Sequence, residues 1–374
     1  MNFTINRDLL LQNLNSVSKA LSNKIQMPIL TGIKFEVKKD AITLTASNNE
    51  ISIQAKISEK HLIDVKEEGV FVAPGKYLID LVRKTDAKDL DFVSYEDNAV
   101  KILADKSNFT LNNLPADGFP AISFADSLIF ITLDATNLKR IIRKTSFATS
   151  LSESRVILTG VSFTCTGEKL EVVATDSFRL AKKDLVFDQI YPEIKVVIPS
   201  KSLDELNKIV EENEDLVEIH FTSTKVLFKY NNLLYQTRLI EGTFPNTNSL
   251  IPTNFLTSIK FNKNELISAI ERAAIFTNID TSNIIQMTLN GDKTVEVTSP
   301  TNEIGAAQEE ITPIDCTNVV PFQIAFSSKY FLEAVRVFDS SEITIHFTGE
   351  IKPFIITGEH DHKLIQLILP VRAS

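Results

Sequence analysis

The residues of this chain that could do chemistry are few. His360-Asp361-His362 places two histidines one residue apart, and at this spacing both can bind one metal ion from a strand. A third ligand would have to come from elsewhere, and the sequence offers no obvious partner. The same segment is typical of a polar hairpin tip before the last strand, and this interpretation is favoured. We therefore predict no metal site and no cofactor.

The other candidate groups for catalysis also have structural interpretations. His220 and His346 occupy equivalent positions in two related strands, which favours a shared structural role. Cys165 lies in a strand pattern and is interpreted as a buried, inert thiol. The sequence contains no phosphate-binding loop, no dinucleotide fingerprint and no triad arrangement with local support. Missing motifs do not exclude catalysis, so a hydrolase on a multi-domain β scaffold stays open as an alternative.

Composition and charge limit the class of protein. The chain has 374 residues, which favours two or three domains, and its formal net charge is −9. An acidic chain argues against a simple nucleic-acid-binding protein, which usually has a basic surplus. Two cysteines are too few for a disulfide framework and indicate a reducing, cytoplasmic compartment. No apolar run approaches the ~20 residues of a membrane-spanning helix, and the first residues do not resemble a signal peptide.

An internal repeat determines the architecture that must position these residues. Three segments open with a short strand and an amphipathic helix, and their matching leucines recur at an interval of 128 residues (138 − 10 and 266 − 138). These are Leu10, Leu138 and Leu266. Each unit is too long for a solenoid repeat, so we expect three domains of one fold. Turn-rich stretches at 114–126 and 242–253 predict domains over residues 1–126, 127–252 and 253–374.

The hydrophobic period predicts two helices in each unit, with strands of period two between them. The predicted helices span residues 8–21, 74–85, 134–148, 200–210, 262–276 and 327–338. Tight hairpins are predicted at Thr166-Gly167-Glu168 and Asn290-Gly291-Asp292. Each domain is therefore expected to be α+β, with two helices packed on antiparallel sheet.

The charges are segregated between the predicted helices and the rest of the chain. The six helices together carry a net positive charge, and the remaining residues are more acidic than the chain as a whole. For any one helix, ordinary surface lysines explain this. Taken together, the helices predict a shared basic face that lines one cavity and meets phosphates without reading sequence.

A threefold repeat of two-helix α+β domains in an acidic chain of this length resembles the bacterial DNA polymerase III beta subunit, the sliding clamp family. The most specific marks are Val173-Ala174-Thr175-Asp176-Ser177-Phe178-Arg179-Leu180-Ala181, Phe244-Pro245 and the ending Ile368-Leu369-Pro370-Val371-Arg372. The resemblance implies a non-catalytic, ring-forming homodimer that encircles duplex DNA without sequence specificity. It also implies that the replicative polymerase, the clamp loader, other polymerases and repair proteins bind through short peptides, in the cytoplasm at the nucleoid. A repeat-built adaptor that never meets DNA is the remaining alternative.

The resemblance also implies three sets of site residues. The peptide-binding cleft between the second and third domains would comprise Leu158, Thr175, Ser177, Phe178, Arg179, Leu180, Pro245, Leu250, Tyr330, Ile351, Pro353, Ile368, Leu369, Pro370, Val371 and Arg372. The DNA-facing residues would be Lys24, Arg83, Arg140, Arg143, Lys144, Lys201 and Lys263. The dimer interface would use Phe109, Leu111, Ile275 and Phe276. Two departures bear on the cleft: Ser177-Phe178 replaces the family's usual Gly-His, and Ala373-Ser374 extend the end.

Overall fold

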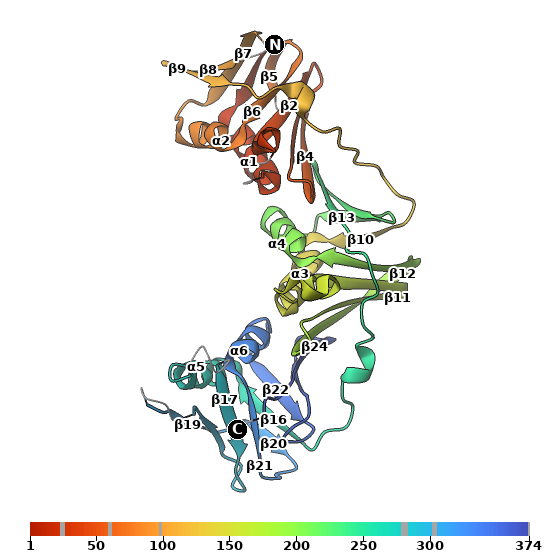
Figure 1. Cartoon of the computed structure of the whole chain (residues 1–374), viewed down its shortest axis with the longest axis vertical. Coiled ribbons are helices and arrows are strands. Elements are labelled where there is room, and N and C mark those ends of the chain that lie inside the picture. The colour runs from red at the N-terminus through yellow and green to blue at the C-terminus, as the bar shows by residue number, and fades with distance from the viewer. Residues whose placement is uncertain (23–26, 59–61, 97–98, 278–282, 301–304, 373–374) are drawn as a thin grey trace. The chain divides into compact units, whose positions relative to one another are not determined.

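The computed structural model describes residues 1–22, 27–58, 62–96, 99–277, 283–300 and 305–372 (Figure 1). All six predicted helices are confirmed, and each begins within one or two residues of its predicted start. They are α1 (Arg7–Val17), α2 (Gly75–Lys84), α3 (Ala135–Thr145), α4 (Ser200–Ile209), α5 (Lys263–Ala274) and α6 (Ser328–Arg336). Short 3₁₀ turns, Ser18–Ala20 and Ser146–Ala148, extend α1 and α3. No helix in the described ranges is long and apolar enough to cross a membrane.

The first helix of each repeat begins at the same kind of cap. The side chain of Asn6 accepts hydrogen bonds from the backbone N–H groups at the start of α1, and Asn262 does the same for α5. The equivalent Asp134 accepts from the N–H of Asn137 in α3 at 2.7 Å. A side-chain acceptor at this position satisfies N–H groups that have no partner inside the helix. Local sequence therefore fixes the same starting point three times.

The chain forms two compact units, and each is described by itself. The first comprises residues 1–138 and 205–239, and the second comprises residues 139–204 and 240–374. This division passes through the middle repeat, because the strands of that repeat pair with strands of both neighbouring repeats.

The first unit holds two antiparallel sheets. The five-stranded sheet has the order β5-β1-β7-β8-β9, and the eight-stranded sheet has the order β10-β13-β14-β15-β4-β3-β2-β6. The strands of the five-stranded sheet are β1 (Asn2–Asn6), β5 (Leu62–Glu67), β7 (Asp89–Glu96), β8 (Ala99–Ala104) and β9 (Ser107–Asn112). Those of the eight-stranded sheet are β2 (Gly32–Lys38), β3 (Ala41–Ser47), β4 (Ile51–Ser58), β6 (Gly69–Pro74), β10 (Phe130–Asp134), β13 (Leu216–Phe221), β14 (Lys225–Tyr230) and β15 (Leu233–Arg238).

The second unit also holds two antiparallel sheets, with the orders β11-β12-β24-β23-β22-β16-β20 and β19-β18-β17-β21. The strands of the larger sheet are β11 (Gly160–Thr175), β12 (Arg179–Pro199), β16 (Thr257–Asn262), β20 (Asp315–Thr317), β22 (Glu342–Phe347), β23 (Phe354–Gly358) and β24 (Leu364–Ile368). Those of the smaller sheet are β17 (Ile284–Leu289), β18 (Val295–Thr298), β19 (Gln308–Ile311) and β21 (Phe322–Ser327). Figure 1 shows α5 and α6 lying on one side of these strands.

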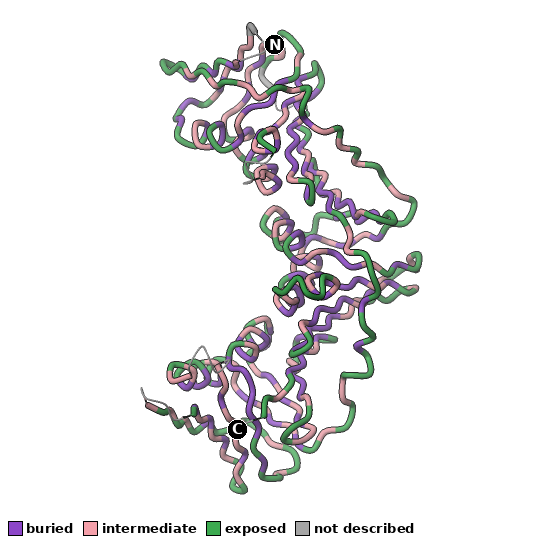
Figure 2. Tube along the Cα trace, in the orientation of Figure 1, coloured by how far each residue is buried: buried purple, intermediate pink, exposed green. Residues whose placement is uncertain are grey.

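Burial follows the predicted periods. In α1 the stripe Leu10, Leu14 and Val17 is fully buried, as the spacing of four and three predicts. In the second unit, Leu266 and Ile270 of α5 join Phe331 and Val335 of α6 in one core with the inward residues of the strands. Figure 2 shows that the buried positions concentrate in the strands and on one side of the helices.

One hairpin prediction is confirmed and the other is wrong. Asn290-Gly291-Asp292 connects β17 to β18, with the N–H of Asn290 donating to the carbonyl of Thr294. Thr166-Gly167-Glu168 does not turn the chain, because β11 continues through it and pairs with β12 along its length. Gly167 has φ +63° and lies where the register shifts on both sides. The extra residues at both shifts lie on β12, so β12 bulges opposite Gly167 while β11 continues.

Candidate functional site

The turn that joins β11 to β12 is built by Asp176, Ser177 and Phe178. One carboxylate oxygen of Asp176 accepts the N–H groups of Phe178 and Arg179, at 2.9 and 3.0 Å. The Thr175 hydroxyl donates to the carbonyl of Arg179 at 2.6 Å and accepts the N–H of Ser177 at 3.2 Å. Ser177 has φ +80°, a left-handed conformation that glycine adopts without strain and serine does not. The hydrogen bonds of the turn thus hold Ser177 in a strained backbone conformation.

Arg179, the residue after this turn, is one of the predicted cleft residues. Its side chain is buried and forms ion pairs with Asp176 and Glu333. It also donates to the carbonyl oxygen of Phe147 at 2.7 Å. Because two carboxylates already neutralise the guanidinium, it is not available to bind a partner's charge. It instead connects the turn to α6 and to the 3₁₀ turn after α3.

Aromatic rings complete the surroundings of Arg179. The guanidinium carbon lies 4.4 Å from the centroid of the Tyr330 ring and 5.3 Å from that of Phe147. Such cation–π contacts are strongest when, as here, water is excluded. Phe178 stacks on Tyr330 with ring centroids 6.5 Å apart and an interplanar angle of 24°. Burial raises the pKa of the Tyr330 hydroxyl. We call these four residues, Phe178, Tyr330, Arg179 and Phe147, the aromatic–guanidinium stack.

The predicted cleft residues fall into two groups by burial. Five of them are buried and leave little surface for a partner to contact. These are Leu158, Thr175, Arg179, Leu180 and Ile368. Ile368 belongs to the core formed by α5, α6 and their strands. Those that are exposed or half-buried are Ser177, Phe178, Pro245, Leu250, Tyr330, Ile351, Pro353, Leu369, Pro370, Val371 and Arg372.

The structure brings several of the exposed residues together. The N–H of Leu369 donates to the carbonyl of Phe178 at 2.9 Å, so the end of the chain lies against the turn. Leu250 and Pro353 both line a groove of about 570 Å³ formed by residues 249–256 and 348–353. Beneath, Leu158 and Leu180 pack in a small core together with Phe244 and Leu367. Sequence reasoning missed Phe244 as a supporting residue, although it directly precedes Pro245.

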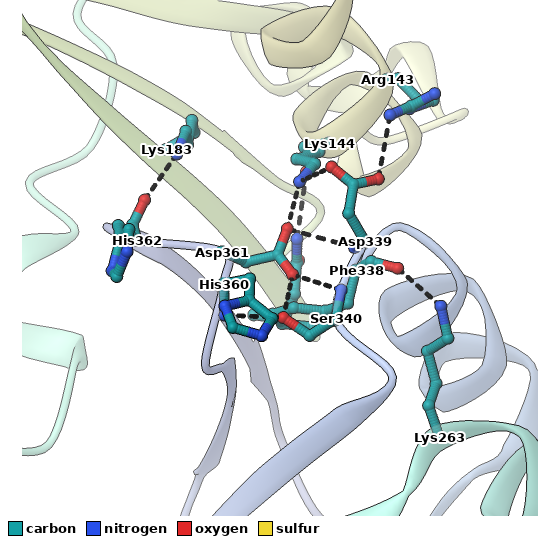
Figure 3. A network of polar contacts seen from close by, with 11 residues as sticks. Arg143, Lys144, Lys183, Lys263, Phe338, Asp339, Ser340, His360, Asp361 and His362 are labelled. Carbon is teal, nitrogen blue, oxygen red and sulfur yellow. Dashed lines mark hydrogen bonds and ion pairs between the residues drawn. The ribbon is translucent and has the colours of Figure 1, made fainter.

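A second polar network involves Lys144, which the sequence placed on the DNA-facing surface. Lys144 is 1% exposed, and its ammonium forms ion pairs with Asp339 and Asp361 (Figure 3). Gln366 of β24 donates to the carbonyl of Lys144 at 3.0 Å. The prediction for Lys144 is therefore wrong, because an ammonium enclosed by two carboxylates cannot meet a phosphate. The ion pairs of Lys144 connect the end of α3 to the third repeat.

The other predicted DNA-facing residues are more accessible. Arg143 is exposed and pairs with Asp339, and Lys263 is half-buried and donates to the carbonyl of Phe338 at 2.8 Å (Figure 3). Lys201 is exposed on α4 and Arg140 is half-buried on α3. In the first unit, Arg83 is exposed and contacts Asp80 and Asn15. Lys24 lies outside the described residues.

The segment His360-Asp361-His362 is the turn between β23 and β24, as predicted. Asp361 is buried, and it accepts hydrogen bonds from the N–H of Asp339 and from the N–H and hydroxyl of Ser340 (Figure 3). Its carboxylate is thereby committed to this network and to Lys144. The carbonyl of His362 accepts a hydrogen bond from Lys183 at 2.5 Å. Burial, followed by the charge of Lys144, lowers the pKa of Lys183.

His220 and His346 have the shared structural role that their equivalent positions predicted. Each ring lies against a phenylalanine that precedes or opens a repeat, Phe130 at 5.1 Å and Phe255 at 4.8 Å between centroids. His220 contacts the backbone of Ser127 and the carboxylate of Glu218. His346 contacts the hydroxyls of Ser258 and Thr357, and burial lowers its pKa.

The predicted dimer residues lie at an edge and at a helix end. Phe109 and Leu111 are half-buried on β9, the edge strand of its sheet. Ile275, directly after α5, is 71% exposed, and Phe276 is half-buried. In the same unit as Ile275, β19 is the edge strand of the four-stranded sheet. Edge strands offer unpaired backbone groups to another chain.

Comparisons with known proteins match the whole chain. The DNA polymerase III beta subunit models match in order: the N-terminal domain at residues 1–123, the central domain at 132–246 and the C-terminal domain at 248–372. A beta sliding clamp of Staphylococcus aureus is 36% identical over 100% of this chain and 99% of its own length. The DNA polymerase sliding clamp of Bacillus subtilis is 36% identical with a TM-score of 0.95, and the DNA polymerase III beta chain of Streptococcus pneumoniae is 34% identical with a TM-score of 0.94. Both structures are covered completely, as is this chain.

These matches define the class as a clamp built from three copies of one α+β domain. The chain belongs to the DNA polymerase III beta subunit family, the bacterial sliding clamps. It is a processivity factor that encircles duplex DNA without sequence specificity, and a non-catalytic subunit of the polymerase holoenzyme.

Acid should destabilise the second unit through Asp361. Burial by itself raises the pKa of this carboxyl, but Lys144, the Ser340 hydroxyl and two backbone N–H groups outweigh burial and lower the pKa to about 2. Because the folded pKa lies below the unfolded value of 3.8, the contribution is present above that pH and is lost as the pH falls toward about 2. Its size is about 2 kcal/mol.

We expect Asp361→Asn to be less stable than the parent at pH 7 and to lose less stability between pH 4 and pH 2, as measured by urea unfolding at each pH. Asp339→Asn is the matched control, because the Asp339 side chain is 52% exposed and contacts the same ammonium. An acid dependence in Asp361→Asn identical to that of the parent would contradict the role of this pair.

Proposed function

We propose that this sliding clamp closes as a homodimer and recruits the replicative polymerase, the clamp loader, other polymerases and repair proteins through short peptides bound on its second compact unit. It would act in the cytoplasm, at the nucleoid. The matched family segments support domain boundaries near the proposed residues 126 and 252. The observation that carries the peptide site is the gathering of exposed apolar side chains around the end of β24.

The proposed cleft has the chemistry of a groove for a short apolar peptide. Phe178 is 60% exposed, Leu250 is 53% exposed, and Leu369 and Val371 are each 37% exposed. The chain after β24 is held in place by the bonds from Leu369 to Phe178 and from the N–H of Val371 to the carbonyl of Ala325. Burying two or three apolar side chains gives ~1.5–3 kcal/mol each before ordering costs. Single sites would therefore bind weakly, and two per ring would add effective concentration.

Deleting Leu369 to Ser374 should abolish peptide binding and leave a folded dimer. The last strand, β24, ends at Ile368, so the deletion removes proposed cleft residues and no strand. Peptide titration, circular dichroism and sedimentation on the truncated chain test this. Deleting only Ala373 and Ser374 is the control and should leave binding intact. A folded, dimeric chain that lacks Leu369 to Ser374 and still binds a polymerase peptide normally would refute the cleft.

Contact with DNA is proposed to be weak, since encirclement provides retention. Arg140, Arg143, Lys201 and Lys263 in the second unit, and Arg83 in the first, keep partly or fully exposed cationic side chains. Lys24 stays in the proposed set. In the first unit, Lys19, Lys76 and Arg83 line a hollow of about 380 Å³ together with Asp80 and Glu205. Mixed charges of this kind suit a loose, mobile contact with phosphates.

The combined variant Arg140→Ala, Arg143→Ala and Lys201→Ala should reduce the salt dependence of binding to a short DNA duplex. Each lost phosphate contact lowers the slope of log affinity against log salt by about 0.9. Fluorescence anisotropy over a salt series measures this. Lys38→Ala with Lys39→Ala, exposed lysines outside the helices, is the control. An unchanged salt slope in the triple variant would contradict the basic-face proposal. Lys144→Ala should instead lower the stability of the fold, because Lys144 is buried and ion-paired.

The dimer is proposed to form between the first repeat of one subunit and the third repeat of the other. The edge strand β9 with Phe109 and Leu111, and the exposed Ile275 with Phe276, support this pairing. Head-to-tail contacts close into a ring when the rotation fits.

Phe109→Glu combined with Ile275→Glu should yield monomers, because each charge would be buried without a partner at an apolar contact. Sedimentation velocity at several concentrations measures the change. Leu128→Glu is the control, since Leu128 is 96% exposed and lies outside the proposed interface. A double variant that dimerises as tightly as the parent would count against the assignment.

A further inference from the structure

Lys182 is a buried lysine on β12 whose cross-strand neighbours are apolar. It is 9% exposed, and it lies opposite Val173 of β11 and Ile365 of β24. Val173 belongs to the small core beneath the proposed cleft, and Ile365 packs against that core. An ammonium group in such surroundings is costly unless polar groups compensate it. The contacts of Lys182 therefore show what the charge is for.

The ammonium group of Lys182 makes two polar contacts. It donates to a carboxylate oxygen of Glu171 at 2.5 Å and to the side-chain oxygen of Asn248 at 2.9 Å. Glu171 has a second cation nearby, because the ammonium of Lys169 lies 3.7 Å from the same carboxylate oxygen. Asn248 is different, since it belongs to the linker between the second and third repeats. The bond from Lys182 therefore ties this linker to the sheet.

The linker around Asn248 contains a short 3₁₀ turn, Asn248–Leu250. The N–H of Leu250 donates to the carbonyl of Thr247 at 3.0 Å, and Ile251, the next residue, packs against the small core. A single 3₁₀ turn is weakly stable by itself, because its hydrogen bonds have poor geometry. A side-chain contact from the sheet therefore limits how far this turn can move.

Leu250 is the residue through which this restraint reaches the proposed cleft. It is 53% exposed, and together with Pro353 it lines the groove of about 570 Å³. An apolar side chain that is already held in place loses less conformational freedom when a partner binds. Lys182 is buried beneath the linker and would not contact the partner.

We propose that Lys182 is a positioning residue for peptide recognition: through Asn248 it holds the 3₁₀ turn where Leu250 meets an apolar side chain of the partner peptide. This inference rests on the proposed peptide-binding function and adds to it a residue outside the predicted cleft set. The buried charge is thereby explained by the linker that it holds and not by the sheet that carries it.

The test replaces Lys182 with methionine, which keeps an apolar stem and removes the ammonium. We expect Lys182→Met in the full-length clamp to bind a fluorescently labelled polymerase peptide roughly two- to tenfold more weakly, as measured by anisotropy. Lys182→Arg should bind like the parent, because a guanidinium can donate to Glu171 and Asn248 at once. Lys169→Met is the matched control and should also bind like the parent, because Lys169 pairs with Glu171 and Asp184.

A double-mutant cycle assigns the effect to Asn248. Asn248→Ala should weaken binding to the same extent as Lys182→Met, and the variant that carries both substitutions should bind no more weakly than either one. Hydrogen exchange at the N–H of Leu250 should be faster in both single variants. Because Asn248 is exposed, Asn248→Ala should keep the urea unfolding midpoint of the parent, which separates positioning from folding.

Three outcomes overturn the inference. If Lys182→Met binds like the parent, or if the two substitutions add in the double variant, Lys182 does not position Leu250 through Asn248, although the cleft stands. If Lys169→Met weakens binding as much as Lys182→Met does, the effect belongs to the charge of the sheet and not to the linker. If the parent itself does not bind the peptide, the proposed cleft fails and the inference fails with it.

Discussion

The pairing of β12 with β24 is the constraint on which the candidate site depends. In this register Arg179 lies opposite Ile368 and Lys183 lies opposite Leu364. The turn before Arg179 and the chain after Ile368 must therefore lie side by side, although they belong to different repeats. Everything proposed for peptide recognition follows from that adjacency. The same register places Gln366 of β24 within hydrogen-bond distance of the end of α3.

Buried positive charges hold this junction together. Arg179 and Lys144 are each enclosed and each paired with two carboxylates. Such pairs add little net stability, because removing both charges from water costs about as much as their attraction returns. Breaking one is costly, since it leaves a buried charge alone. Their effect is therefore to fix geometry, and the burial of Lys144 removes one cation of the helices from the proposed contact with DNA.

The repeat determines where equivalent residues lie, and the neighbours of each residue determine which contacts it makes. His220 and His346 lie in equivalent strands against equivalent phenylalanines, yet one contacts a carboxylate and a backbone group and the other contacts two hydroxyls. The caps Asn6, Asp134 and Asn262 differ less, because the N–H groups at a helix start require an acceptor in every copy.

The sequence by itself determined the features that depend on neighbouring residues. The hydrophobic period placed six helices, the recurring leucines indicated three copies of one fold, and the polar segment at His360 was correctly expected to be a turn. Asn290-Gly291-Asp292 was correctly predicted as a hairpin for the same reason, because turn chemistry is local. The family marks located the segments of the proposed cleft, and the exposure of Phe178, Leu250 and Leu369 is compatible with that location.

Only the tertiary structure decided which of those residues are accessible. Lys144 and Arg179 carry no local signal of burial, because the groups that enclose them come from distant parts of the chain. Thr166-Gly167-Glu168 fits a turn pattern, yet the long pairing of β11 with β12 carries the strand through it. A local pattern limits the conformation of a few residues, whereas burial depends on which strands pair, and that is settled by contacts across the whole fold.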